Sequence, residues 1–282
     1  MNNKVRRNLL LALKWAFLIV VLGCIYLPIL VIIVYSFSGE QNIGSVNGFG
    51  EFTFTLYKKL FTNSRGLMAA TKNTLIIGVS SALLATFIGT LTAVGLYYLK
   101  KGKKAVNFIS QITVVNAEIV TAVGFFLLSI VIVQVCAKRG LYIEMGMGWL
   151  ILAHTVITTP YVILTVGPRL NQLNPNLYEA GLDLGAGPMR SLFTVIIPQL
   201  VGGMISGFAL AFTLSLDDFV VTNLNKGTSG IDTITTYVYA SLRRSLDPAI
   251  RALSTIIFVV VLVALIIFNV VKNKKQKQQS VK

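Results

Sequence analysis

Long apolar runs alternate with short polar segments along the chain, and this pattern predicts helices that cross a membrane. A spanning helix needs about 20 mostly apolar residues. Six runs are long enough: Leu9–Phe37, Ala70–Leu99, Val106–Val135, Met147–Val166, Ile197–Thr222 and Ala249–Val271. We therefore predict an all-α integral membrane protein with six transmembrane helices, forming one transmembrane domain over residues 1–282.

A polar segment, EAGLDLGAGPMRSLFTVIIPQ, separates the fourth and fifth apolar runs at Glu179–Gln199. Asn174 is the predicted N-cap of a short helix, with Pro175 at the first helical position. Gly185 ends that helix, because glycine tolerates the left-handed conformation of a C-terminal turn, and Pro188 starts a second one. We call residues 174–196 the elbow. Its small residues permit close approach of another protein surface, and the alternative is an ordinary connecting loop.

The composition is that of a membrane protein. The chain is 55% hydrophobic and 12% charged, with a mean hydropathy of +0.76, whereas a soluble domain carries roughly 25% charged residues. The net charge of +15 would suit a nucleic-acid partner. The basic residues lie in short clusters beside apolar runs, however, so membrane topology explains them better, and we predict no nucleic-acid partner.

The basic clusters also predict the orientation of the chain. Lys and Arg gather before the first apolar run, in KKGKK at residues 100–104, and after the last run. Since cytoplasmic loops carry the excess of Lys and Arg, both termini are predicted to be cytoplasmic. The loop of about residues 168–196, which contains the elbow, then lies in the cytoplasm. The aromatic segment GFGEFTFTLYKKLF lies outside as a short amphipathic piece at the interface.

The elbow resembles the EAA loop of the membrane subunits of bacterial ABC importers. It has Glu179-Ala180-Gly181, then Gly185, then Val195-Ile196-Ile197-Pro198, at the spacing of that family. The departures are small or apolar replacements: Gly181 for Ala, Val195 for Ile and Ile197 for Leu. The resemblance implies a coupling helix that docks on an ATPase subunit. The implied docking positions are Glu179, Ala180, Gly181, Asp183 and Gly185.

Other segments resemble the spermidine/putrescine permease subunit family, of the PotC type. They are FTFTLYKKLFTN, TKNTLIIGVSSALLATFIGTLTA and LSLDDFVVTNL. The resemblance implies a permease subunit that moves polyamines into the cytoplasm by alternating access, in the bacterial inner membrane. The implied partners are a sister permease subunit, a cytoplasmic ABC ATPase dimer that uses ATP and Mg²⁺, an extracytoplasmic substrate-binding protein and a small polycationic substrate. Related subgroups carry other small solutes.

Acidic residues in or beside the predicted spans are candidates for the substrate path, because a charge at the bilayer centre costs about 3 kcal/mol on insertion scales. Glu118 is predicted to lie about twelve residues into the third span. Asn107, Gln111 and Phe125 share its helical face. This stripe indicates either a water-filled path or a structural hydrogen bond between helices.

Asp217 and Asp218, near the outer end of the fifth span, form a second candidate. A polyamine can be received by spaced carboxylates and by aromatic faces, which Tyr237 and Tyr239 in the following loop would provide. The alternative is a solvated helix end, or one Asp that serves packing. His154 in the fourth span either relays protons or, more commonly, bonds a neighbouring helix.

The chain lacks a phosphate-binding G-x-x-x-x-G-K-[S/T] loop, a nucleophile–base set and a metal-ligand cluster. We therefore predict a subunit that is not an enzyme and holds no cofactor, with ATP hydrolysis in a partner. The rival of another class is a secondary transporter driven by an ion gradient, with Glu118 and His154 as its proton groups. Such transporters often contain internal repeats, and this sequence shows none.

Overall fold

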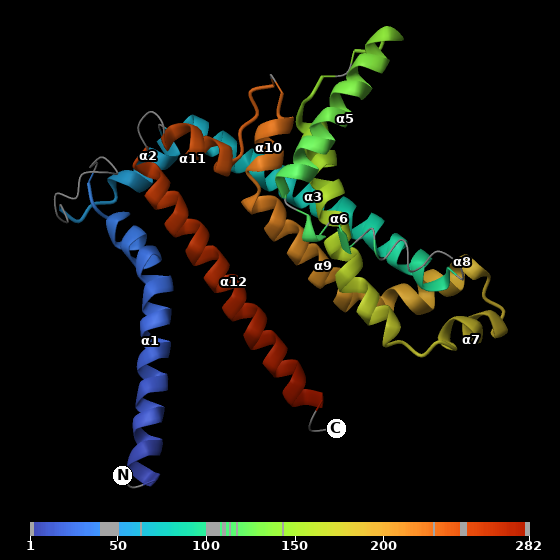
Figure 1. Ribbon diagram of the computed structural model, residues 1–282, viewed down its shortest axis with the longest axis horizontal. Helices are drawn as coiled ribbons and strands as arrows, with labels where there is room; N and C mark the ends of the chain where they lie inside the picture. Colours follow the sequence, from blue (N-terminus) through green and yellow to red (C-terminus); the bar gives the residue numbers. More distant parts are fainter. Residues whose placement is uncertain are drawn as a thin grey trace. The chain divides into compact units, whose positions relative to one another are not determined.

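The protein is helical over almost all of its described length (Figure 1). This computed structural model describes residues 3–39, 51–62, 64–99, 108, 111–112, 114–116, 118–142, 144–227, 229–242 and 247–279, with the backbone alone described at 3–10, 264–265 and 267–279. The helices are α1 (Asn3–Tyr35), α2 (Thr55–Thr62), α3 (Arg65–Tyr98), α5 (Glu118–Lys138), α6 (Met147–Asn171), α7 (Leu177–Asp183), α8 (Pro188–Ser191), the π-helix η1 (Leu192–Ile196), α9 (Ile197–Asp217), α10 (Val220–Asn225), α11 (Ile234–Leu242) and α12 (Ala249–Gln279). A lone antiparallel bridge joins Ser38 to Phe52. The all-α prediction is confirmed.

Five helical stretches in the described part of the chain are long and apolar enough to cross a membrane: Leu11–Tyr35, Arg65–Tyr98, Glu118–Lys138, Met147–Asn171 and Pro188–Asp217. They correspond to the first five predicted spans. The sixth predicted span falls on α12, where the described apolar stretch, Ala249–Val263, is shorter than the other five.

Two predicted spans differ from the observed helices. The third predicted span is interrupted by a bend at Asn116, after which α5 begins at Glu118; residues 108, 111–112 and 114–115 before the bend are also helical, and its predicted start at Val106 lies outside the described residues. The fifth was expected to reach Thr222, but α9 ends at Asp217 because Asp218 adopts an extended conformation, φ −64° and ψ 128°. Hydropathy continues through both breaks, so apolar length alone did not reveal them. Asn107 lies outside the described residues.

The chain forms two compact units, of which Ala69–Tyr237 is the larger. In this unit α6 lies along α9 (Figure 1). The buried side of α9 presents small residues four apart: Gly203, Gly207, Ala211 and Ser215. A Cβ at Gly207 would lie 2.7 Å from Thr165 Oγ1 and 3.1 Å from Val162 Cγ1 of α6. Small residues let membrane helices approach this closely. The close packing of α6 on α9 therefore fixes the positions of the segments that follow each helix.

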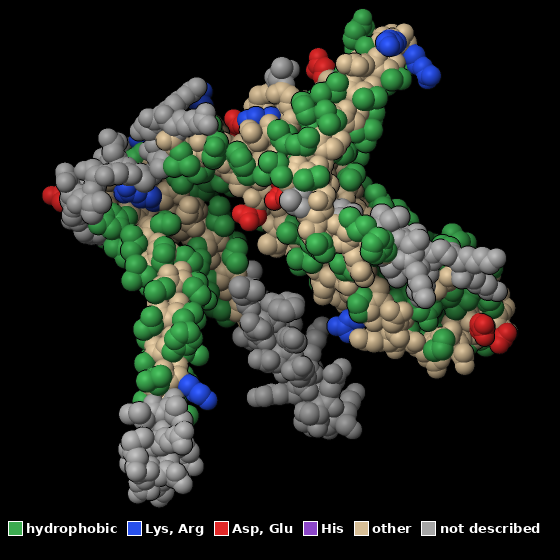
Figure 2. Space-filling model, viewed as in Figure 1, with side chains coloured by type: hydrophobic (Ala, Val, Ile, Leu, Met, Phe, Trp, Pro, Cys, Tyr) green, Lys and Arg blue, Asp and Glu red, His purple; other side chains and the backbone are tan. Residues whose placement is uncertain are grey.

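The other unit, Met1–Met68 with Val238–Lys282, contains α1, α2 and α12. A short amphipathic helix, α2, lies in the predicted aromatic segment and buries Leu56 and Leu60; its place at the membrane interface stays a prediction. Asp247 fixes the start of α12: its carboxylate accepts from the backbone N–H of Ala249 at 3.0 Å and from Ser64 Oγ at 3.2 Å. Hydrophobic side chains cover α1 (Figure 2), and none in its spanning stretch is buried within the chain. Such a surface requires lipid or a partner around it.

Candidate functional site

The site begins where α9 stops and α10 starts. The buried carboxylate of Asp218 lies in this break and accepts three hydrogen bonds. The donors are the backbone N–H of Val221 at 3.1 Å, the backbone N–H of Thr222 at 2.9 Å and Thr222 Oγ1 at 2.9 Å. The first amides of a helix have no partner within the helix. Asp218, the residue before the N-cap Phe219, therefore satisfies two of these amides of α10 with its side chain.

His154 of α6 joins this cap to the neighbouring helices. Its Nδ1 lies 2.7 Å from Ser215 Oγ of α9, and its Nε2 lies 3.0 Å from Thr222 Oγ1 and 3.4 Å from Asp218 Oδ2. Ser81 of α3 donates to Ser215 Oγ at 3.1 Å. The imidazole is 2% exposed. Both ring nitrogens are thus engaged between helices, which is the structural role that the sequence left open for His154.

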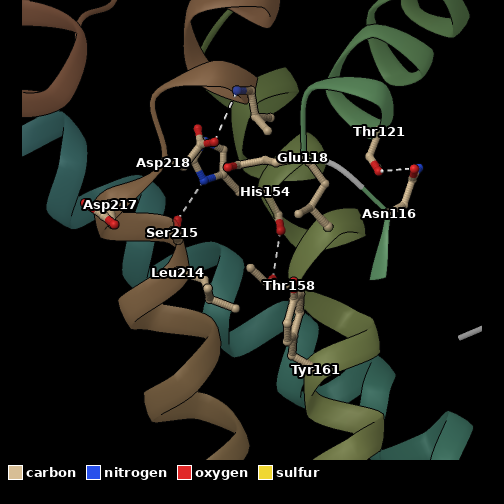
Figure 3. Close-up of a pocket in the computed structure, with 12 residues that line it drawn as sticks. Asn116, Glu118, Thr121, His154, Thr158, Tyr161, Leu214, Ser215, Asp217 and Asp218 are labelled. Carbon is tan, nitrogen blue, oxygen red and sulfur yellow. Dashed lines mark hydrogen bonds and ion pairs between the residues drawn. The ribbon is translucent and has the colours of Figure 1, made fainter. Parts of the chain in front are cut away.

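A cavity of about 140 Å³ opens beside this network (Figure 3). Its polar lining comes from α5 and the bend before it, from α6 and from the α9–α10 break: Asn116, Glu118, Thr121, His154, Thr158, Tyr161, Ser215, Asp217 and Asp218. Ile157, Leu214 and Val221 supply the apolar lining. The space is large enough for several water molecules or for part of an elongated ligand.

Three acidic residues line this cavity, and they differ in availability. Asp218 is 7% exposed and already accepts three hydrogen bonds. Glu118 and Asp217 are exposed, and the carboxyl of Glu118 interacts with both aspartates. Figure 3 shows Glu118 reaching from α5 toward Asp218 and His154. Glu118 and Asp217 therefore remain accessible to a ligand, whereas Asp218 stabilises the break between α9 and α10.

The predicted position of Glu118 is wrong, although its place beside Asp217 and Asp218 puts all three predicted acids at one site. Glu118 is the first residue of α5 and does not lie in mid-span. An acid in the first turn is favoured by the helix dipole. Gln111 lines a different cavity, of about 160 Å³, with Tyr97 and Asn171. The polar stripe expected along one continuous helix is therefore not formed.

The predicted aromatic residues do not line the acidic cavity. Phe125 packs against Trp149, with the ring centroids 5.4 Å apart. Tyr237 and Tyr239 lie on α11, which Thr235 connects to the site by donating to the Asp218 carbonyl at 2.7 Å. A part for these three rings in a substrate path stays a prediction.

Sequence reasoning missed the hydroxyl residues of the network. Thr222 lies four residues after Asp218, so this contact is local and its spacing was visible in the sequence. Ser81 and Ser215 gave no such signal, since they meet only through helix packing. Among the described residues, no group of three or more His, Cys, Asp and Glu is arranged to hold a metal ion.

The elbow is a second candidate site. Gly185 has a φ of +83°. The N–H of Gly185 donates to the Leu182 carbonyl at 2.9 Å, and that of Ala186 donates to the Gly181 carbonyl at 3.2 Å. This pair of bonds is the Schellman motif, so the predicted glycine stop is confirmed. Pro188 begins α8, also as predicted.

The predicted N-cap is wrong, because α7 begins at Leu177, later than expected. Asn174 Oδ1 accepts from the backbone N–H of Asn176 at 3.0 Å and closes a turn before the helix. This local bond competes with capping, as is common for Asn.

Gly181 lies inside the elbow. It is buried, and a Cβ there would collide with Ser191 Oγ and lie 3.4 Å from Val195 Cγ2. Ser191 Oγ donates to the Tyr178 carbonyl at 3.1 Å across the same contact. The prediction that Gly181 belongs to an outer docking surface therefore does not fit its position, which joins α7 to α8 and η1.

The outer side of the elbow is exposed and mixed in character. Glu179, Ala180, Asp183 and Gly185 are exposed there, and Figure 2 shows acidic side chains gathered around α7. Leu184 is 89% exposed at the end of α7. An exposed leucine beside acidic residues on a rigid turn is suited to contact another protein.

Known proteins resemble the chain over nearly its whole length. Residues 85–275 match the family described as the inner membrane component of binding-protein-dependent transport systems. The chain is 32% identical to the spermidine/putrescine transport system permease protein PotC of Haemophilus influenzae over 263 residues, 93% of this chain and 97% of that protein. It is 31% identical to PotC of Escherichia coli K12 over 266 residues, 94% and 96% of the two chains.

The putrescine transport system permease protein PotI of Escherichia coli K12 is 31% identical over 247 residues, 86% of this chain and 85% of that protein. The fold is also similar to that in a crystal structure of a bacterial ABC transporter involved in the import of the acidic polysaccharide alginate. The TM-score is 0.65 at 14% identity, over 97% of this chain and 98% of the other. The chain therefore belongs to the family of inner membrane components of binding-protein-dependent transport systems.

Proposed function

We propose that this chain is a permease subunit of an ATP-driven importer that carries polyamines, spermidine or putrescine, into the cytoplasm. The observation that carries the proposal is the acidic cavity, where Glu118 and Asp217 are open to a ligand between apolar helices. Relatives named for spermidine and putrescine transport support the choice of solute. A polyamine is a flexible chain of methylene groups between ammonium groups, which suits a cavity with both acidic and apolar walls.

In this proposal Glu118 and Asp217 receive one ammonium group of the passing substrate. Charge-assisted hydrogen bonds from ammonium to carboxylate are strong, and Ile157, Leu214 and Val221 contact the methylene chain. Asp218 and His154 touch the substrate little and keep the break between α9 and α10 in shape. The binding is modest, because a tight site in the membrane would retard release.

The membrane arrangement we propose has six spans, with α12 as the sixth, and both termini in the cytoplasm. The lysine and arginine clusters at the two ends and at residues 100–104 support this orientation. The elbow then faces the cytoplasm. The protein is a multi-pass component of the bacterial inner membrane.

We also propose that the outer side of the elbow docks on a cytoplasmic ATPase. Glu179, Ala180, Asp183, Leu184 and Gly185 form this docking surface. The complete importer contains a sister permease subunit, an ATPase dimer that binds ATP and Mg²⁺, and an extracytoplasmic substrate-binding protein. Closure of the ATPase pair moves the elbow, and the permease pair alternates between outward-facing and inward-facing states.

The proposal is tested by transport with the full set of subunits. The chain is co-expressed with the ATPase, the sister permease and the binding protein, and the complex is reconstituted into vesicles. We expect ATP-dependent uptake of labelled spermidine or putrescine. Glu118→Gln and Asp217→Asn should each lower uptake about tenfold, because each removes one charge-assisted bond.

Glu144→Gln is the matched control, since Glu144 is an exposed acid away from the cavity, and it should transport like the unaltered complex. Uptake that follows a proton gradient without ATP would overturn the proposal in favour of a secondary transporter. ATP hydrolysis stimulated by another solute, with no polyamine uptake, would retain the importer and reject the substrate.

A further inference from the structure

An apolar groove runs between α1 and α12. It encloses about 380 Å³ and is lined mainly by Ile29, Ile32 and Ile33 of α1 and by Ser254, Phe258 and Val261 of α12. Its walls are aliphatic and aromatic over most of their area. Both helices expose apolar side chains around it, so a hydrocarbon chain fits this groove better than water does.

A positive charge lies on α12 just before the residues that line the groove. Arg251 precedes Ser254 by three residues, so it lies on the groove side of α12. Its guanidinium stacks over the ring of Tyr35, 5.8 Å from the centroid, at the last residue of α1. Arg251 Nη1 is buried and has no hydrogen-bond partner. A partly buried charge without an anion is costly.

The nearest acid along the chain does not neutralise Arg251. Asp247 is occupied by Ser64 Oγ, by the backbone N–H of Ala249 and by Lys59, whose Nζ lies 4.0 Å from Oδ1. No carboxylate among the described residues forms an ion pair with Arg251. Within the described part of the chain, Nη1 of the guanidinium is therefore left without an anion.

Aromatic residues indicate the depth at which this charge lies. Phe37, Phe52, Phe54 and Tyr57 cluster just beyond the end of α1, with Phe37 and Phe52 stacked at 5.2 Å. Aromatic belts of this kind sit at the level of lipid headgroups. Arg251 and Tyr35 are then near the headgroup level, and the groove extends from them toward the hydrocarbon.

We propose that the α1/α12 groove binds a phospholipid, with one acyl chain along Ile32 and Phe258 and the phosphate on the guanidinium of Arg251. Arginine binds phosphate through paired N–H donors. A purely apolar transmembrane helix of another subunit would fill the groove but would leave the charge of Arg251 without an anion. The lipid site is separate from the acidic cavity and does not depend on which solute is transported.

Two measurements test the proposal on the full-length chain. In the first, dioleoyl phosphatidylglycerol is titrated against the purified chain in detergent, and native mass spectrometry counts bound lipid. We expect one preferentially bound lipid. Arg251→Gln should lower its affinity about tenfold, Arg251→Lys less, and the control Arg139→Gln, at an exposed arginine, not at all. Inorganic phosphate should not displace the lipid.

In the second measurement, the photoreactive residue p-benzoylphenylalanine replaces Ile32 in cells, and arginine is kept at position 251. We expect an adduct with the mass of a lipid. A protein adduct would overturn the proposal, and so would equal lipid affinity in the Arg251→Gln and unaltered chains or displacement of the lipid by phosphate. Size-exclusion profiles of the Arg251→Gln chain distinguish loss of lipid binding from loss of the fold. The photo-adduct tests lipid binding with arginine in place, so it remains informative even if Arg251→Gln misfolds.

Discussion

The elbow and the acidic cavity are built in opposite ways. The bonds that shape the elbow are local: Ala186 to Gly181 along the backbone, and Ser191 to Tyr178, thirteen positions apart. The bonds that shape the cavity join His154 to residues 61 and 68 positions away, and Ser81 to Ser215 at 134 positions. The elbow therefore keeps its shape by itself, whereas the cavity exists only while α3, α6, α9 and α10 keep their packing.

This difference suits the two tasks that we propose. A docking element must transmit force without deforming, and a short block with a glycine stop and one buried contact does this. A substrate site in an alternating-access transporter must change as helices move, and a network spread over four helices responds to small displacements. Adjacent residues can then have opposite roles, as Asp217 and Asp218 do.

The largest effect that we predict separates these two aspartates. Asp218→Ala removes three accepted hydrogen bonds and leaves the first amides of α10 and the Thr222 hydroxyl without their acceptor. We expect a loss of about 2–4 kcal/mol in the free energy of unfolding. Asp217→Ala should change stability by no more than about 0.5 kcal/mol while lowering transport. Thermal unfolding in detergent measures the first quantity, and equal losses for both variants would contradict the division of roles.

The next effect tests whether the elbow is rigid. Gly181→Ala places a Cβ against Ser191 Oγ, with Ser191 Cβ at 3.2 Å, and overpacking of this kind costs about 1–3 kcal/mol. Ser191→Ala removes the colliding atom, so the double variant should be more stable than Gly181→Ala alone. Gly187→Ala is the matched control, because open space surrounds Gly187, and it should behave like the unaltered chain. If the Gly181→Ala chain had the same thermal unfolding temperature as the control, the elbow would not be rigid at this contact.

The same contrast explains how much could be predicted from the sequence. Apolar length located five helices, and turn chemistry located the stop at Gly185 and the start at Pro188, because both signals depend on residues within one turn. The bend before Glu118 and the break at Asp218 occur inside apolar stretches. Hydropathy is insensitive to them, so the bend before α5 was not predicted and the end of α9 was predicted too late in the sequence.

The sequence identified Glu118, Asp217 and Asp218 as candidates but did not show which of them is structural and which are accessible to a ligand. The role of Asp218 follows from contacts with Thr222, which is local, and with His154, which only tertiary packing brings near. Gly181 presents the same limit at the elbow. Its position in the EAA pattern suggested an outer surface, but only the packing of α7 on α8 and η1 shows that it faces Ser191.

The smallest effect that we predict concerns the outer side of the elbow. Leu184 is 89% exposed and contributes little to the fold, so Leu184→Ala should leave thermal stability unchanged. If the elbow docks on an ATPase, this side chain is its most prominent apolar contact, and its removal should weaken binding of the purified ATPase to the reconstituted chain about fivefold. Leu141→Ala, at a leucine that is 61% exposed in the segment after α5, is the control and should bind normally. Unchanged affinity for Leu184→Ala, or the same loss with Leu141→Ala, would remove Leu184 from the docking surface. The elbow can thus lose its binding partner and keep its fold. The cavity, in contrast, should lose both its shape and its ligand when Asp218 is replaced.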